Sequence, residues 1–263
     1  TMGDIIFKIG PRINASGRIQ NGKEAVDLLT ERDFKAAIEK SNQINQYNET
    51  RKDLDKTMTE EANKIVEGLE GLSDRRSIVI FNEQWHKGVI GIVASRLTEI
   101  YYRPAVVLTR TGDMATGSAR SVSGFDVYRA IEHCRDLLEN FGGHTYAAGL
   151  SMKIEHVEEF TRRFEEYVSE NIQPTQTDAV IDIDEELSFR DISMKFYHDL
   201  KRFEPYGPDN LKPVFCTRQV YDYGTSKVVG HNQEHIKLEL VDNLSNRVMN
   251  GIAFGQSSQA RYI

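Results

Sequence analysis

The chain has 263 residues, a hydrophobic share of 39% and a net charge of −7, values typical of a soluble globular protein with one large domain or two medium ones. No run of about 18 apolar residues occurs, which excludes a membrane span, and no basic segment followed by an apolar stretch indicates a signal peptide. The acidic balance disfavours a protein that binds nucleic acid through its bulk charge, although basic groups gathered in one cleft would still suit phosphate. Cys134 and Cys216 lie far apart in the sequence, and we expect reduced, structural thiols of a cytoplasmic protein. The start at Thr1 and Met2, followed at once by folded-looking sequence, is typical of a cut chain.

The first 30 residues combine a short apolar segment with a polar one. Ile5–Phe7 predicts a strand, residues 10–18 a loop rich in Gly, Asn and Arg, and residues 24–29 a short helix, with Thr30 as the N-cap of the next helix. The loop is unusually rich in specific polar groups. Two arginines and an amide could bind a nucleic-acid backbone, and a simple capping loop is the alternative. These polar residues are Arg12, Asn14 and Arg18.

Residues 31–72 predict one long helix. Proline is absent, glycine is absent before Gly68, and sparse apolar residues recur at spacings of three, four or seven. A helix of about 38 residues would be about 57 Å long, and its mostly polar surface suits a strut that joins two lobes. A dimerising coiled coil is the competing interpretation, but no strict heptad is kept.

Residues 73–172 alternate strand and helix patterns, which predicts an α/β domain. Gly142 and Gly143 are expected to break the chain between the second predicted helix and the last predicted strand. The predicted strands are 77–81, 104–109, 117–121 and 150–154, and the predicted helices are 88–101, 127–139 and 157–169.

After residue 173 the pattern is mostly β, as in a small barrel or sandwich. The predicted strands are 179–183, 214–223, 235–241 and 247–254, with one helix at 193–202. The predicted organisation is therefore a leading segment, a long helix, an α/β domain and a β domain, with the ranges 1–30, 31–72, 73–172 and 173–263.

The Gly-Gly-His segment at residues 140–149 is the first candidate site. Gly142 and Gly143 let the backbone approach a ligand closely, and amide groups at the start of a following helix would favour an anion. His144 could donate a hydrogen bond or a proton to a phosphate oxygen. A turn with a surface histidine is the alternative.

Two further segments could bind phosphate. If residues 117–121 form a strand, Ser118 and Arg120 project to the same side, where a hydroxyl and a guanidinium suit a phosphate; an exposed strand with one ion pair is the alternative. Residues 85–96 place His86 and Lys87 before a helix start, and Trp85 either stacks on a base or belongs to the core. Ser121 is a further candidate in the first of these segments, and Arg96 is a further candidate in the second.

No metal site is expected in this chain. His231 and His235 are four residues apart but lack a third ligand at a standard spacing, and no Asp-His-His triplet or Asp/His cluster suited to two divalent ions is present. The sequence has parts that could hold a substrate and no catalytic centre.

In order along the chain, these motifs resemble the RecJ family. The Gly-Gly-His motif alone would indicate only the DHH superfamily, whereas the Pro-Tyr-Gly-Pro-x-Asn segment that enters the β domain narrows the resemblance to RecJ. The segments that carry it are residues 10–18, Asn48 with Arg51, and residues 85–97, 117–121, 141–149 and 204–215.

The resemblance implies a fold, an activity and roles for residues. RecJ enzymes degrade single-stranded DNA from its 5′ end in recombination and repair, with Mn²⁺ or Mg²⁺ held by an N-terminal DHH lobe. A long helix joins that lobe to an α/β DHH-associated domain, which an OB-like β barrel domain follows. The sequence therefore predicts the C-terminal part of such an enzyme, which lacks the metal lobe, binds no metal itself and is inactive alone.

By the same resemblance, Ser118, Arg120, Gly143 and His144 would grip the 5′ phosphate and the scissile region. Arg12, Asn14 and Arg18 would face the missing lobe, and residues from about 175 onward would guide single-stranded DNA. Expected partners are that DNA, the missing lobe and repair proteins such as a helicase or a single-strand-binding protein. The alternatives are a phosphodiesterase of short oligonucleotides or cyclic dinucleotides, and a non-catalytic module that binds repair proteins.

Overall fold

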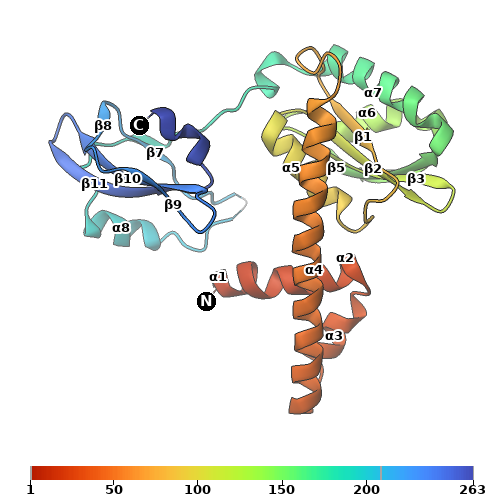
Figure 1. Ribbon diagram of the computed structural model, residues 1–263, viewed down its shortest axis with the longest axis horizontal. Helices are drawn as coiled ribbons and strands as arrows, with labels where there is room; N and C mark the ends of the chain where they lie inside the picture. The colour runs from red at the N-terminus through yellow and green to blue at the C-terminus, as the bar shows by residue number, and fades with distance from the viewer. Residues whose placement is uncertain (1, 208, 263) are drawn as a thin grey trace. The chain divides into compact units, whose positions relative to one another are not determined.

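The computed structural model describes residues 2–207 and 209–262, so Thr1, Ile263 and Pro208 of the 204–215 motif lie outside the described residues. The chain divides into two compact units, Thr1–Ala179 and Val180–Ile263, which are described separately (Figure 1). Within the described ranges, no helix combines the length and the apolar character that a membrane span requires.

Residues 2–19 are continuously helical, so the predicted strand at 5–7 and loop at 10–18 are wrong. Pro11 lies in the first turn of its helix, where a missing N–H is tolerated, and Ala15 and Ser16 are completely buried. Packing of this face against the long helix therefore outweighs the low helix propensity of Gly10, Pro11 and Gly17. The elements are α1 (Met2–Asp4), η1 (Ile5–Ile9), α2 (Gly10–Ile19) and α3 (Lys23–Leu29).

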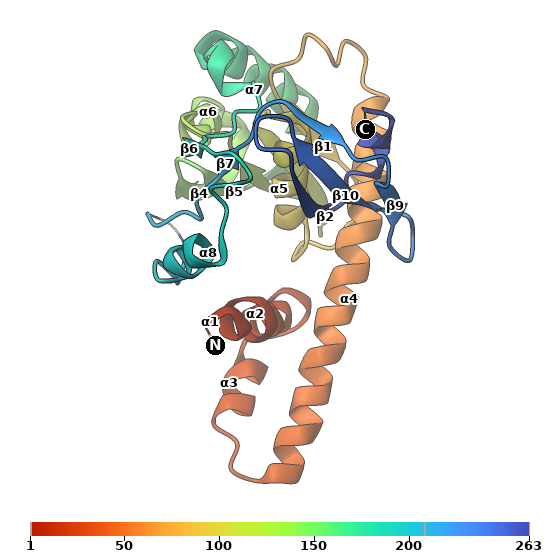
Figure 2. The same ribbon diagram turned by 90° about the vertical axis from the view of Figure 1, so that its left-hand side faces the viewer.

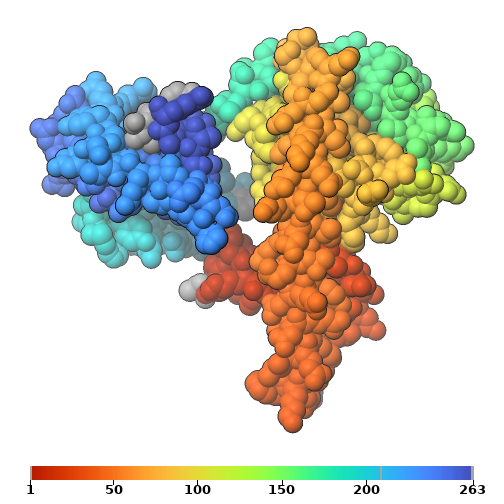
Figure 3. All heavy atoms as spheres, in the orientation of Figure 1, coloured from red at the N-terminus to blue at the C-terminus, as the bar shows by residue number. Residues whose placement is uncertain are grey.

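The predicted long helix is confirmed as α4 (Phe34–Glu67), whose 34 residues make it about 51 Å long. Its N-cap is Asp33, which accepts the N–H of Ala36 at 2.8 Å; the predicted cap, Thr30, instead ends α3. Figure 2 shows α3 running antiparallel to the start of α4, and one side of α4 is open to solvent (Figure 3). Its buried stripe is Ile44, Asn48, Met58, Ala62 and Val66.

A five-stranded sheet forms the centre of the first unit, in the order β1-β2-β3-β5-β4. β1 and β2 are parallel, and the other neighbouring pairs are antiparallel. The predicted helix at 127–139 ends early, because a 3-10 turn leads directly into β4, and Gly142 and Gly143 lie inside that strand instead of breaking the chain. The strands are β1 (Ile78–Phe81), β2 (Ala105–Thr111), β3 (Met114–Arg120), β4 (Leu138–His144) and β5 (Ala147–Lys153).

Helices cover both faces of this sheet. α5 (Ile90–Tyr101) and the second half of α4 pack on one face, against apolar side chains of β1 and β2 such as Ile80 and Val107. On the other face, α6 (Val127–His133) and α7 (Val157–Asn171) cover β3 and β5, with Phe160 and Phe164 completely buried. Short 3-10 turns complete the unit: η2 (Arg135–Leu137), η3 (Ile154–His156) and η4 (Pro174–Gln176).

The second unit is built on short strands around one helix. The predicted strand at 179–183 is wrong, since the first strand begins at Glu185, and the predicted strand at 214–223 is divided into two. Asp242 is buried and ties the loop before the helix to the sheet, because its carboxylate accepts the hydroxyl of Ser188 and the N–H of Phe189. The elements are β6 (Glu185–Glu186), α8 (Met194–Lys201), β7 (Phe215–Cys216), β8 (Val220–Asp222), β9 (Lys227–Val229), β10 (His235–Asp242), β11 (Arg247–Ala253) and η5 (Ser257–Tyr262).

Candidate functional site

A cavity of about 490 Å³ lies where the end of α2 meets β3 and the turn before α5. It brings together five residues that the sequence singled out from three separate segments. We call it the cationic cavity, and define it by residues 17–20, 86–88, 90–91, 116–118 and 120. The predicted site residues in it are Arg18, His86, Lys87, Ser118 and Arg120.

Ser118 and Arg120 alternate along β3 and project to the same side, as the strand pattern predicted. The guanidinium of Arg120 donates to Ser118 Oγ at 2.9 Å and to the carbonyl of Ala119 at 2.7 Å. A Cβ at Gly91 would lie 3.0 Å from both the Arg120 Nη2 and the Ser118 Oγ, so the bare backbone of α5 gives these two polar groups their space.

The electrostatics of the cavity favour an anion. Neither Arg18, Lys87 nor Arg120 forms an ion pair with any carboxylate of the described chain, and no acidic residue lines the cavity. Burial of the guanidinium, followed by the positive charge of Arg18, lowers the pKa of Arg120 from its usual value. A phosphate oxygen would supply the missing negative charge, and the first turn of α5 would add the favourable end of a helix dipole.

The turn before α5 supplies His86, Lys87 and Gly88. His86 Nδ1 accepts the N–H of Gly88 at 3.1 Å, so the turn is closed locally. Trp85 is only 5% exposed, and its indole N–H donates to Glu61 at 2.7 Å; of the two interpretations of this residue, the core one is confirmed.

Arg18 closes the cavity from α2. Its Nη1 donates to the carbonyl of Gly88 at 3.0 Å, and a Cβ at Gly88 would lie 2.1 Å from the Arg18 carbonyl oxygen. Glycine is therefore required at position 88, since any side chain there would push the end of α2 away.

Four of the seven remaining predicted residues lie outside the cavity, on α2, on α5 and directly after β3. Arg12 donates from Nε to Asn45 on α4 at 2.6 Å, and Asn14 lies exposed on α2. Arg96 pairs with Glu99 at 3.3 Å on the exposed side of α5, and the Ser121 hydroxyl donates to the Phe125 carbonyl at 2.8 Å.

The Gly-Gly-His motif lies on the same sheet, at the end of β4. His144 pairs with Ala147, which pairs with Arg120, so His144 is two strands, or about 10 Å, from Arg120 in the same row and on the same face. No helix follows the motif, so the predicted helix-start anion site is wrong here, because His144 leads through a short hairpin into β5.

The two glycines of the motif differ. A Cβ at Gly143 would lie 2.3 Å from the Ala147 carbonyl oxygen, so strand pairing requires glycine there, whereas a Cβ at Gly142 would meet nothing within 4 Å. His144 is exposed, and its Nδ1 accepts the N–H of Tyr146 at 3.3 Å.

Sequence reasoning missed two polar residues of the cavity, Gln20 and Thr116. Thr116 precedes Ser118 by two positions on β3, so strand alternation would have found it. Gln20 follows α2, and no sequence motif points to it. Its position in the cavity depends on α2, which the sequence did not predict as a helix.

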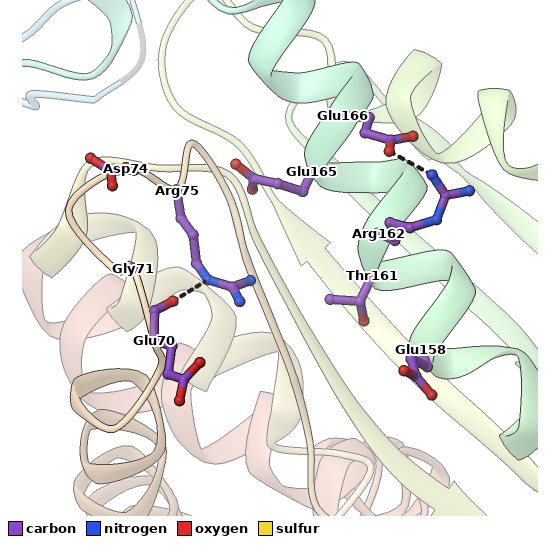
Figure 4. A pocket seen from close by; sticks show the side chains of 9 residues that line it. All are labelled: Glu70, Gly71, Asp74, Arg75, Glu158, Thr161, Arg162, Glu165 and Glu166. Atoms are coloured by element: carbon purple, nitrogen blue, oxygen red, sulfur yellow. Dashed lines mark hydrogen bonds and ion pairs between the residues drawn. The ribbon is translucent and has the colours of Figure 1, made fainter.

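A larger cavity of about 640 Å³ lies between the α4–β1 loop and α7, but its chemistry is less specific (Figure 4). Arg162 is already paired with Glu166, and the Arg75 guanidinium donates to the Glu70 carbonyl. Glu165 binds the backbone N–H groups of Arg76 and Ser77, which fixes the loop before β1. We therefore assign this cavity a structural role.

A divalent metal ion does not fit the residues that the structure describes. They contain no group of three or more His, Cys, Asp or Glu side chains able to hold an ion, and no carboxylate lines the cationic cavity.

Comparison with known proteins identifies both units. Residues 74–170 match the family model of the DHHA1 domain, and residues 183–263 match that of the RecJ OB domain, so together the two models cover more than half of the chain. The single-stranded-DNA-specific exonuclease RecJ of Bacillus subtilis (strain 168) is 35% identical over 89% of this chain and 30% of its own length. The protein of the same name from Escherichia coli (strain K12) is 31% identical over 95% of this chain and 44% of its own length.

Solved structures agree with these matches. RecJ from Thermus thermophilus in complex with Mg²⁺ superposes with a TM-score of 0.79 and 24% identity, over 95% of this chain and 37% of that one. Exonuclease RecJ bound to manganese superposes with a TM-score of 0.59 and 29% identity, over 68% of this chain and 44% of that one. The chain spans less than half the length of these relatives. The resemblance read from the motifs is thereby confirmed, and the chain belongs to the RecJ family, of which it carries a DHHA1 domain followed by a RecJ OB domain.

Proposed function

We propose that this chain is the DNA-binding portion of a 5′→3′ single-strand-specific exonuclease, and that its cationic cavity holds the 5′-terminal phosphate. The observation that supports the proposal is a cavity with three cationic side chains, Arg18, Lys87 and Arg120, that have no carboxylate partner in the described chain. A terminal phosphate carries more charge than an internal one and can accept from Arg120 and Ser118 together.

The site test compares Arg120→Ala with the unmodified chain on single-stranded oligonucleotides with a 5′ phosphate or a 5′ hydroxyl. The phosphorylated oligomer should lose about tenfold or more in affinity, since a hydrogen bond to a charged group contributes about 1.5–3 kcal/mol. The hydroxylated oligomer should lose much less. Arg110→Ala is the matched control, because Arg110 lies on the neighbouring strand and pairs with Glu83 outside the cavity. Equal losses on both oligomers would contradict the proposal.

The second unit supplies a surface for the rest of the strand. One face of its sheet carries several exposed side chains, among them aromatic and basic ones, which suits stacking of bases and contact with phosphates. Residues of this face are Tyr221, Tyr223, Lys237, Ile252 and Phe254.

A length series tests this surface. Tyr221→Ala combined with Tyr223→Ala should weaken binding of an oligomer of about 12 nucleotides and leave binding of a phosphorylated dinucleotide unchanged. Binding of the longer oligomer should also weaken as salt rises, because phosphate contacts release counterions. A preference of the unmodified chain for dinucleotides would favour a phosphodiesterase of short oligonucleotides instead.

Catalysis belongs to the longer protein in this proposal. The RecJ structures named above contain Mg²⁺ or manganese, and we propose that the metal ions of the full-length enzyme are held by a lobe outside this chain. The purified chain should therefore retard 5′-phosphorylated single-stranded DNA in Mn²⁺ without cleaving it, and cleavage abolished by a chelator would overturn this division. A cytoplasmic location and binding of a helicase or a single-strand-binding protein remain predictions.

A further inference from the structure

The turn that carries His86, Lys87 and Gly88 into the cationic cavity is fixed at its first residue, Trp85. The indole N–H donates to Glu61 Oε2 on α4 at 2.7 Å, and the backbone carbonyl accepts the hydroxyl of Thr109 on β2 at 2.6 Å. The turn is thus held from two elements that the cavity itself does not include.

Thr109 has no other evident reason to be polar. Its side chain is completely buried, and the four residues that precede it on β2, Ala105 to Leu108, are apolar and completely buried as well. A buried hydroxyl costs free energy unless it is hydrogen-bonded, and here its bond goes to the turn.

The side chains that face the anion depend on this turn for their position. The carbonyl of His86 accepts the N–H groups of Val89 and Ile90 at 2.9 and 3.3 Å, so the turn continues directly into α5. Lys87 is exposed and forms no ion pair with the described residues, so its location is set by its backbone. The carbonyl oxygen of Gly88 accepts a hydrogen bond from Nη1 of Arg18 at 3.0 Å.

We propose that Thr109 and Glu61 are positioning residues of the cationic cavity: acting through Trp85, they hold the His86–Gly88 turn in the conformation that binds a phosphate. The inference rests on the proposed phosphate binding. When either bond is removed, the turn samples other conformations, and the apparent affinity falls by the fraction of chains that remain competent. Loss of one buried hydrogen bond should weaken binding about five- to tenfold.

Matched pairs of variants separate positioning from general stability. Thr109→Val removes the hydroxyl, Thr109→Ser keeps it, and Ser77→Ala removes another buried hydroxyl, whose bond goes to Glu165 on the far face of the sheet. Glu61→Ala and Glu60→Ala make the same charge change at adjacent positions on the exposed side of α4, and only the first removes the indole bond.

The assay is anisotropy of a labelled 5′-phosphorylated oligodeoxythymidine of about 12 nucleotides, with melting temperature measured beside it. We expect about five- to tenfold weaker binding for Thr109→Val and Glu61→Ala, with a red-shifted emission of Trp85, the single tryptophan. Thr109→Ser should restore the affinity. Ser77→Ala should melt lower yet bind normally, and Glu60→Ala should match the unmodified chain.

Equal affinities of Glu61→Ala and Glu60→Ala would overturn the inference, and so would losses that merely follow the melting temperature across all variants. If Thr109→Val does not fold, the glutamate pair decides alone. Failure of the unmodified chain to bind the oligomer would overturn the proposed function, and this inference with it.

Discussion

Alanine should have opposite effects at two glycines of the first unit, Gly88 and Gly142. Both residues have ordinary negative φ angles, so backbone strain does not distinguish them. What differs is the space for a Cβ, which would lie 2.1 Å from the Arg18 carbonyl oxygen at position 88 and would meet nothing within 4 Å at position 142.

The expected changes in folding stability follow from two opposing contributions, conformational entropy and steric repulsion. Replacing glycine by alanine in regular structure stabilises a protein by about 0.5–1 kcal/mol, because glycine loses more conformational freedom on folding. Forcing a methyl group into a packed backbone contact costs about 1–3 kcal/mol. The free energy of unfolding should therefore rise by about 0.5–1 kcal/mol in Gly142→Ala and fall by about 1–2 kcal/mol in Gly88→Ala.

Urea denaturation followed by tryptophan fluorescence measures this difference. Trp85 is the single tryptophan and is buried in the first unit, so its signal reports that unit alone. In Gly88→Ala the displaced end of α2 should also become a site of proteolysis, and binding of a 5′-phosphorylated oligomer should weaken. An unfolding midpoint of Gly88→Ala at or above that of the unmodified chain would refute the close contact of Arg18 with Gly88.

Three further outcomes follow from groups outside the cavity. Hydrogen bonds from Ser188 and Ser245 hold the pKa of Asp242 below its usual range, so its stabilisation is present above the unfolded pKa of about 4 and is lost as pH falls through the lower folded value. The urea midpoint of Asp242→Asn, followed by tyrosine signals, should accordingly lie below that of the unmodified chain at pH 7, with the gap narrowing in acid. Burial raises the pKa of Cys134 to about 11, so a thiol reagent at pH 8 should modify one of the two cysteines, the half-buried Cys216; two reactive thiols in the native chain would contradict this burial. Glu165→Ala should lower the melting temperature by freeing the loop before β1, with no change in oligonucleotide affinity if the larger cavity is only structural.

The elements that the sequence predicts well are those whose pattern follows from their own burial. α4 keeps an apolar stripe over 34 residues, β2 has a run of five fully buried residues, and β1 alternates buried with half-buried apolar residues. A periodic pattern of this kind predicts whether a segment is a helix or a strand without knowledge of its packing partners.

The errors lie where tertiary packing decides against local propensity. Gly10, Pro11 and Gly17 argue for a loop, and only the burial of Ala15 and Ser16 against α4 makes the segment helical. Gly142 and Gly143 argue for a break, yet β4 is completed by its pairing with β5, a contact that lies outside any local window.

The same limit applies to the site. The motifs identified Arg18, Lys87 and Arg120 separately, and strand alternation correctly placed Ser118 beside Arg120. That these groups surround one cavity depends on the packing of α2 against the turn before α5, which no spacing in the sequence encodes. For the same reason, Arg12 could not be recognised as a residue that binds Asn45 on α4.

The net charge of −7 misleads because charge acts over a limited distance. Five of the 40 acidic side chains lie on α7, which covers the face of the sheet opposite to α5, and some are paired there, as Glu159 is with Arg162 and Arg163. The whole sheet lies between α7 and α5, and solvent-exposed charges farther apart than the Debye length of about 10 Å at 0.1 M ionic strength are largely screened from one another. Arg120 is instead half-buried and has a second cation, Arg18, as its neighbour. An anion that enters the cavity therefore meets the local positive charge almost undiminished, and the acidic remainder of the surface opposes binding mainly at low salt.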